Sequence, residues 1–126
     1  MSNNPKFLAI DDNEDHIELI RLLNKSFNFQ IDFGINIFDF LSHVNKFNYD
    51  VILCDLNLHY QKEGLDILKS YQQYGLKSKI SAYTSNSADE SFFLEKGFHG
   101  VIRKNLKQLR QLFKNLKTEK ITILTN

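Results

Sequence analysis

Residues 7–20 read FLAIDDNEDHIELI, an apolar segment followed by a pair of acids and the start of an amphipathic segment. The apolar segment, Phe7–Ile10, has the character of a strand in a protein core, and the carboxylates of Asp11 and Asp12 follow it directly. Two carboxylates about 4 Å apart repel each other by a few kcal/mol near a protein surface. The stretch therefore predicts a core strand that ends where water, a cation or a positively charged side chain neutralises the acids.

The rest of the chain repeats this alternation of short apolar and longer amphipathic segments, which predicts repeated β-α units. Val51–Cys54, within YDVILCDL at 49–56, is the clearest strand. It is continuously apolar, as are strands of a parallel sheet that helices cover on both faces. The five predicted strands are Phe7–Ile10, Gln30–Phe33 closed by Gly34, Val51–Cys54, Lys79–Tyr83 and Val101–Arg103.

Five helices are predicted between and after these strands. They are Glu14–Phe27 with Asp12 or Asn13 as its cap, a helix on Ile37, Phe38, Leu41 and Val44, a helix on Leu65, Ile67, Leu68 and Tyr71 ended by Gly75, Ala88–Lys96 from the capping-box pattern SADE, and Leu106–Leu116. The result is an α/β fold, a doubly wound five-stranded parallel sheet with five helices. The tail KITILTN is either an extra strand or a loosely held extension.

The length of 126 residues fits a single domain, with a core at about 6–116 and residues 117–126 as a C-terminal extension. A hydrophobic content of 42% and a charged content of 25% are typical of soluble globular proteins. One cysteine excludes an internal disulfide. The longest apolar runs have four residues, so no membrane span or signal-peptide core is expected, and we interpret the chain as cytoplasmic.

The net charge of +1 hides an uneven distribution. Residues 1–95 hold 8 Lys/Arg against 14 Asp/Glu, whereas residues 96–126 hold 8 against 1. The basic segment could mark an acidic or nucleic-acid partner, although a solvated helix face is the favoured interpretation. No helix-turn-helix pattern follows residue 116, so nucleic acid is not the expected partner.

Polar residues follow the predicted strands at their carboxyl ends, the edge where ligands bind in doubly wound sheets. These residues are Asp11 and Asp12, Asp55, Thr84 with Ser85, and Lys104. Clustered carboxylates form an all-oxygen pocket that suits Mg²⁺. A carboxylate can also act as a nucleophile toward phosphorus, and a lysine and a metal ion can then offset the charge of the phosphoryl group.

On these residues the chain resembles the receiver domains of the two-component response-regulator family. The motifs are IDDNEDHIELI at 10–20, YDVILCDLNL at 49–58, YTS at 83–85 and GVIRK at 100–104. Each is weak alone. Their order and their separations of 43, 29 and 20 residues, from 12 to 55, 55 to 84 and 84 to 104, make the resemblance specific over about residues 6 to 116.

The resemblance implies a phosphoacceptor module rather than an enzyme. Asp55 would accept a phosphoryl group from a histidine kinase or phosphotransfer protein, Thr84 would hydrogen-bond that group, and Lys104 would pair with it. Mg²⁺ would be held by Asp11, Asp12, Asp55 and the main-chain carbonyl of Asn57. Phosphorylation would change contacts with a downstream protein, and the chain would be a monomer or weak homodimer.

Several positions depart from the family pattern. Val101 stands where many members carry a switching aromatic residue, Asn105 and His59 replace prolines, and Gly64 comes one residue late. These departures keep open an alternative function, that of a switch-deficient adaptor that binds proteins constitutively. A flavodoxin-like or nucleotide-binding protein is a third possibility, but DDNED is the electrostatic opposite of a phosphate-binding loop.

The remaining polar residues give no second site. His16 and His43 are interpreted as helix residues and His59 as a loop residue, because the histidines lack the spacing of metal ligands. Cys54 is interpreted as a buried structural thiol.

Overall fold

The structure is a computed structural model, and it describes residues 6–56, 63–85 and 88–125. These residues form one sheet of parallel strands in the order β2-β1-β3-β4-β5. The strands are β1 (Lys6–Ile10), β2 (Gln30–Gly34), β3 (Val51–Asp55), β4 (Lys79–Thr84) and β5 (Gly100–Arg103). All five predicted strands are confirmed, each to within one residue at either end.

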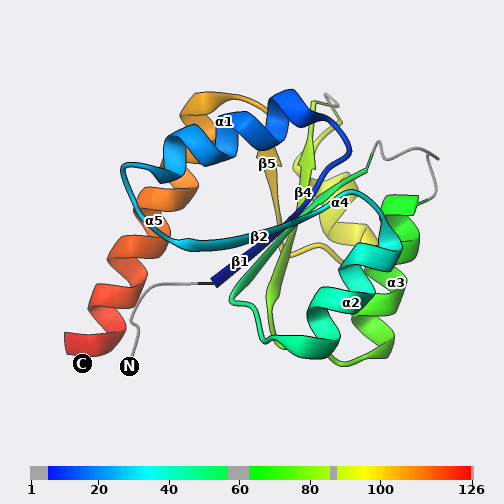
Figure 1. Ribbon diagram of the computed structural model, residues 1–126. Coiled ribbons are helices and arrows are strands. Elements are labelled where there is room, and N and C mark those ends of the chain that lie inside the picture. Colours follow the sequence, from blue (N-terminus) through cyan, green and yellow to red (C-terminus); the bar gives the residue numbers. More distant parts are fainter. Residues whose placement is uncertain (1–5, 57–62, 86–87, 126) are drawn as a thin grey trace.

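Five helices connect and follow the strands in the described part of the chain, and they lie on both faces of the sheet (Figure 1). They are α1 (Glu14–Asn24), α2 (Ile37–Lys46), α3 (Glu63–Gln73), α4 (Glu90–Lys96) and α5 (Leu106–Thr125). α1 and α5 cover one face, whereas α2, α3 and α4 cover the other. The predicted doubly wound α/β fold is therefore confirmed.

Each face of the sheet has its own hydrophobic core, which explains why β1 and β3 lack an in-out alternation of apolar and polar residues. Along β3, Ile52 and Cys54 pack on the side of α2, α3 and α4, whereas Val51 and Leu53 pack on the side of α1 and α5. All four side chains are at most 3% exposed. Phe113 of α5 closes the second core with rings of the same cluster, its centroid 5.1 Å from that of Phe7.

The predicted start of α4 is wrong. The pattern SADE suggested a helix from Ala88, but Ala88 and Asp89 are not helical, and the helix begins at Glu90. Asp89 occupies the N-cap position without a side-chain cap hydrogen bond.

The helix α1 ends earlier than predicted, at Asn24 instead of Phe27. The side-chain amide of Asn24 bonds the backbone of Phe29 twice: Nδ2 donates to the carbonyl and Oδ1 accepts the backbone amide, at 2.8 Å each.

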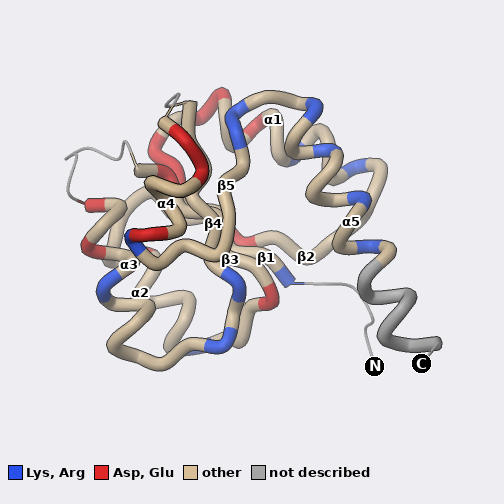
Figure 2. The backbone as a smooth tube through the Cα atoms, turned by 180° about the vertical axis from the view of Figure 1, so that it is seen from behind, with Lys and Arg blue, Asp and Glu red and all other residues tan. Residues whose placement is uncertain are grey.

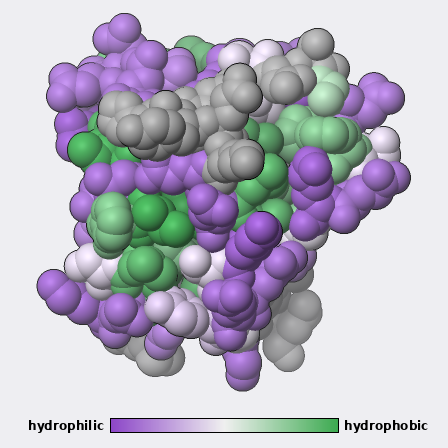
Figure 3. All heavy atoms as spheres, turned by 90° about the vertical axis from the view of Figure 1, so that its right-hand side faces the viewer, coloured by the Kyte–Doolittle hydropathy of each residue, from purple (hydrophilic) through white to green (hydrophobic). Residues whose placement is uncertain are grey.

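The inward face of α2 differs from the prediction. Phe38 was expected in the apolar stripe, yet its side chain is 76% exposed, whereas Phe40 is fully buried. Successive helix residues are about 100° apart, so a face centred on Ile37, Phe40 and Val44 turns Phe38 outward. Figure 3 views the side of the molecule on which α2 and α3 lie, and hydrophobic side chains reach the surface there among hydrophilic ones.

The C-terminal tail is helical. The predicted extra strand is wrong, because α5 continues to Thr125. The other alternative, a loosely held extension, stays a prediction. The β-branched residues of the tail favour a strand, but no glycine or proline ends the helix after Leu116, so it propagates.

The positive charge of the C-terminal segment lies along α5 (Figure 2). The side chains of Lys107, Arg110, Lys114 and Lys117 are exposed, at the spacing of one helix face. Both interpretations of this segment, a solvated face and a docking surface for an acidic partner, remain predictions.

Candidate functional site

The first acids of the site are fixed where β1 passes into α1. Asp11 is fully buried, and its amide donates to the carbonyl of Gly34 at the end of β2, with N···O 3.0 Å. Its Oδ1 accepts the amide of Asn13 at 2.9 Å. Asn13 in turn caps α1, because its Oδ1 accepts the amides of Asp15 at 2.8 Å and His16 at 3.4 Å. The turn thus holds the Asp11 carboxylate at the carboxyl edge of the sheet.

Asp55 ends β3, the central strand of the sheet, and is 1% exposed. The preceding Cys54 is fully buried, with its Sγ 3.7 Å from the carbonyl oxygen of Asp55 and 3.6 Å from that of Gly64. Burial raises the pKa of the Cys54 thiol, and the neighbouring Asp55 carboxylate adds to this effect. The structure therefore agrees with the interpretation of Cys54 as a neutral, structural thiol.

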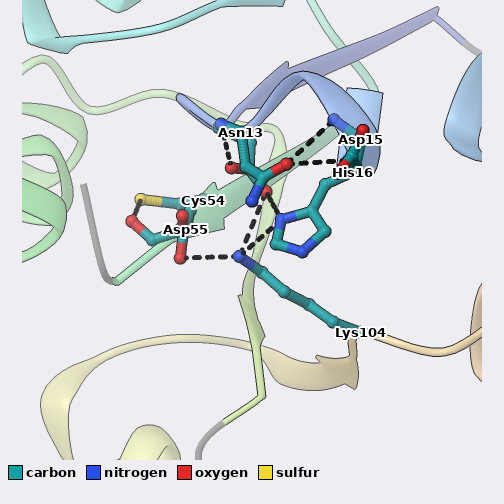
Figure 4. A network of polar contacts seen from close by, with 7 residues as sticks. Asn13, Asp15, His16, Cys54, Asp55 and Lys104 are labelled. Carbon is teal, nitrogen blue, oxygen red and sulfur yellow. Dashed lines mark hydrogen bonds and ion pairs between the residues drawn. The ribbon is translucent and has the colours of Figure 1, made fainter. Parts of the chain in front are cut away.

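Lys104 reaches into the same edge from the end of β5 (Figure 4). Its Nζ lies 3.1 Å from Asp11 Oδ2 and 3.1 Å from Asp55 Oδ1, and its side chain is only 6% exposed. The ammonium also stands 5.2 Å from the ring centroid of Tyr83, within cation–π range. A buried lysine joins two carboxylates that are 44 positions apart in the chain, as predicted from the strand ends.

The predicted metal ligands come together in part. Asp11, Asp12 and Asp55 offer carboxylate oxygens that all lie within 4.8 Å of one another. Asp11 and Asp55 are buried, and Asp12 is partly exposed at the rim. A purely oxygen donor set at this spacing fits a hard cation such as Mg²⁺ after small side-chain movements. The fourth predicted ligand, the carbonyl of Asn57, lies outside the described residues, as does His59.

Thr84 ends β4 next to Lys104. It is fully buried, and its carbonyl accepts the amide of Lys104 at 3.0 Å. Ser85, the second candidate hydroxyl, is exposed. Val101 lies on β5 and packs, partly buried, against the core on the side of α2, α3 and α4. No aromatic rotamer switch exists at that position.

Sequence reasoning missed the place of His16. It is a helix residue, as predicted, but its Nδ1 lies 3.0 Å from Asp11 Oδ2 and 3.2 Å from Lys104 Nζ. Figure 4 shows the ring turned toward the end of Lys104. The available signal was its position in the first turn after the Asn13 cap, because that turn borders the acids. His43 lies in α2 as predicted, with its Nε2 3.1 Å from the carbonyl of Phe33.

Tyr83 is a second residue that the sequence did not single out. It is 1% exposed, and its hydroxyl has no hydrogen-bond partner within the described part of the chain. Burial raises the pKa of Tyr83, and the carboxylates of Asp11 and Asp55 raise it further. Tyr83 is therefore a neutral side chain whose ring contacts the ammonium of Lys104.

The family model of the response regulator receiver domain matches residues 7–117. The chain belongs to this family. This match confirms the resemblance drawn from the strand-end motifs. Receiver domains are signalling modules of two-component systems. No curated protein matched the chain in a sequence search.

Solved receiver structures share this fold. The receiver domain of the Francisella response regulator 1452 is 20% identical with a TM-score of 0.78, over 92% of this chain and 98% of that one. A two-component response regulator from Clostridium difficile is 21% identical with a TM-score of 0.77, over 91% and 97%. The chemotaxis response regulator CheY4 of Vibrio cholerae is 20% identical with a TM-score of 0.75, over 90% and 98%.

Among the described residues, no helix combines the length and the apolar character that a membrane crossing needs.

Proposed function

We propose that this receiver accepts a phosphoryl group on Asp55, with Mg²⁺ as cofactor, and that the modification changes its contacts with a downstream protein. The observation that carries the proposal is the bridge of Lys104 Nζ to Asp11 and Asp55, at 3.1 Å each, beside a third carboxylate on Asp12. A buried ammonium between two acids places positive charge where a phosphoryl group would bring more negative charge.

The residues proposed to hold Mg²⁺ are Asp11, Asp12, Asp55 and the main chain of Asn57. When bound, the ion would supply positive charge that offsets the negative charge of the acids and of the phosphoryl oxygens. Asp11 already accepts a hydrogen bond from the amide of Asn13 and contacts Lys104. Asp12, which is partly exposed at the rim, is proposed to bind the ion directly, and Asp11 partly through water.

The covalent step proposed for Asp55 is nucleophilic. One Oδ attacks phosphorus, the new O–P bond gives an acyl phosphate, and the P–N bond of a phosphohistidine donor breaks. The imidazole of the donor leaves with the electron pair. Lys104 would then pair with the phosphoryl group, and Thr84 at the end of β4 would donate its hydroxyl to a phosphoryl oxygen.

The wider setting is proposed from the family. The donor would be a histidine kinase or phosphotransfer protein, the setting cytoplasmic, and the working unit a single receiver domain over 1–126. Because Val101 leaves no aromatic switch on β5, the structural response would have to travel by another route. A switch-deficient adaptor is the competing function, and the phosphorylation test below separates the two.

The test uses a small-molecule donor. The protein is incubated with acetyl phosphate and Mg²⁺, and its intact mass is measured. We expect the mass of one added phosphoryl group in the wild type and in Asp66→Asn, an exposed carboxylate on α3 outside the pocket. Asp55→Asn should show no adduct, and omission of Mg²⁺ should abolish the adduct in every protein.

An unmodified wild type at all donor concentrations would contradict the proposal and favour the adaptor. An adduct that persists in Asp55→Asn would place the phosphoryl group on another residue.

A further inference from the structure

The carboxylate of Asp11 already has partners on both oxygens. Oδ1 accepts the amide of Asn13 at 2.9 Å, and Oδ2 lies 3.1 Å from Lys104 Nζ and 3.0 Å from His16 Nδ1. Each carboxylate oxygen has two lone pairs, so the two partners of Oδ2 occupy both, and a metal ion can bind this oxygen only when one of them withdraws. The groups around Asp11 Oδ2 therefore decide how readily this carboxylate becomes available to a cation.

His16, Asp11 and Lys104 form a closed cluster. The three atoms Nδ1, Oδ2 and Nζ are 3.0, 3.1 and 3.2 Å apart, so each one contacts the other two. Asp11 is 1% exposed and Lys104 6%, whereas the side chain of His16 is 31% exposed. The imidazole thus covers a buried ion pair from the side of α1.

Whether Nδ1 of His16 carries a proton decides which of its two contacts, with Asp11 Oδ2 or with Lys104 Nζ, is a hydrogen bond. With a lone pair on Nδ1, His16 accepts from the ammonium of Lys104. With a proton on Nδ1, it donates to the carboxylate of Asp11. Both arrangements add a partner to the ion pair, so both stabilise the pocket in the form that has Lys104 between the two acids.

We propose that His16 is a positioning residue that stabilises the bridge between Asp11 and Lys104 and thereby lowers the affinity of the pocket for Mg²⁺. The inference rests on the proposed function, because the cation competes with the ammonium of Lys104 for the same acids. His16 would set the Mg²⁺ concentration at which the pocket is filled, before any phosphoryl group arrives.

The sign of the effect separates this role from that of a metal ligand. Removal of a partner from the resting cluster should tighten Mg²⁺ binding, whereas removal of a metal ligand should weaken it. One hydrogen bond to a charged group corresponds to about a tenfold change in the dissociation constant. Partial exposure of the imidazole makes tenfold an upper value.

The experiment measures Mg²⁺ binding by isothermal titration calorimetry at one pH and ionic strength. We expect His16→Leu to lower the dissociation constant several-fold and up to about tenfold. His16→Asn should bind within about twofold of the wild type, because an amide atom occupies the position of Nδ1 and can donate or accept. If the imidazole only filled space, the smaller asparagine would not restore the wild-type dissociation constant for Mg²⁺.

His43→Leu is the matched control, because it removes a helical imidazole that bonds the carbonyl of Phe33, away from the acids. Its dissociation constant should equal that of the wild type. Weaker or unchanged Mg²⁺ binding in His16→Leu, while Asp12→Asn lowers the affinity as a ligand should, would overturn this inference alone. Absence of Mg²⁺ binding in the wild type and in His16→Leu would overturn the proposed function together with the inference.

Discussion

The hydroxyl of Tyr83 should cost this protein stability. The residue is 1% exposed, and its oxygen has no hydrogen-bond partner in the described part of the chain. An unsatisfied buried polar group costs about 1–3 kcal/mol relative to its hydrated state. The substitution Tyr83→Phe removes only that oxygen and leaves the ring beneath Lys104 and against the core of α1 and α5. We expect the free energy of unfolding to rise by about 1–2 kcal/mol.

The assay is urea unfolding at pH 7, with thermal unfolding as a second measurement. For a chain of this length, each kcal/mol should move the melting temperature by about 3–5 °C. Tyr49→Phe is the control, because Tyr49 is also buried, at 5% exposed, but donates its hydroxyl to Asp32 Oδ2 at 2.6 Å. That variant should lose about 1–2 kcal/mol, since it breaks a hydrogen bond to a charged group.

Alkaline pH gives an independent measurement on the same residue. Burial raises the pKa of Tyr83 above the ordinary tyrosine value of about 10. The folded state then keeps the proton at a pH where the unfolded state has lost it. The resulting stability is present below pH 10 and is lost as the pH rises, with a slope of up to about 1.4 kcal/mol per pH unit. Tyr83→Phe should lose stability less steeply than the wild type in this range.

The reasoning fails if Tyr83→Phe lowers the free energy of unfolding by 1 kcal/mol or more. Such a loss would mean that the hydroxyl has a stabilising partner in the native protein.

Two further pairs of variants test the local geometry of the site. Asn13→Ala should lower the free energy of unfolding by about 1 kcal/mol through loss of the α1 cap, whereas Asp89→Ala should change it little, because Asp89 makes no cap hydrogen bond. Equal losses in urea unfolding would contradict the assignment of Asn13 as the stronger cap. Gly64→Ala would place Cβ 2.7 Å from the carbonyl oxygen of Asp55 and should destabilise the protein by about 1–3 kcal/mol. Gly100→Ala, whose Cβ would lie at an ordinary contact distance of 3.6 Å from the Ser81 hydroxyl, should be nearly neutral by the same measurement; a neutral Gly64→Ala would show that α3 can shift away from Asp55.

The acids and the lysine of the pocket could be predicted because their signal is local. Asp11 and Asp55 directly follow apolar segments, and Lys104 directly follows the predicted strand Val101–Arg103. The parallel topology then brings these strand ends to one edge whatever the side-chain details. The bounds of β1 and β3 were predictable for a related reason: a strand buried on both faces is almost continuously apolar, and the polar residue that ends it is visible in the sequence.

Only the tertiary structure decided the surroundings of the pocket. His16 lies in an ordinary amphipathic helix, and its contact with Lys104 joins residues 88 positions apart, which depends on how α1 sits over the sheet. The unsatisfied hydroxyl of Tyr83 likewise depends on what packs around it, not on its neighbours in the chain. Phe38 shows the same limit, because the packing of α2 against the sheet sets the rotation of that helix. The sequence thus determined at which strand ends the charged residues lie, whereas three-dimensional packing determined which other side chains, such as His16, contact them.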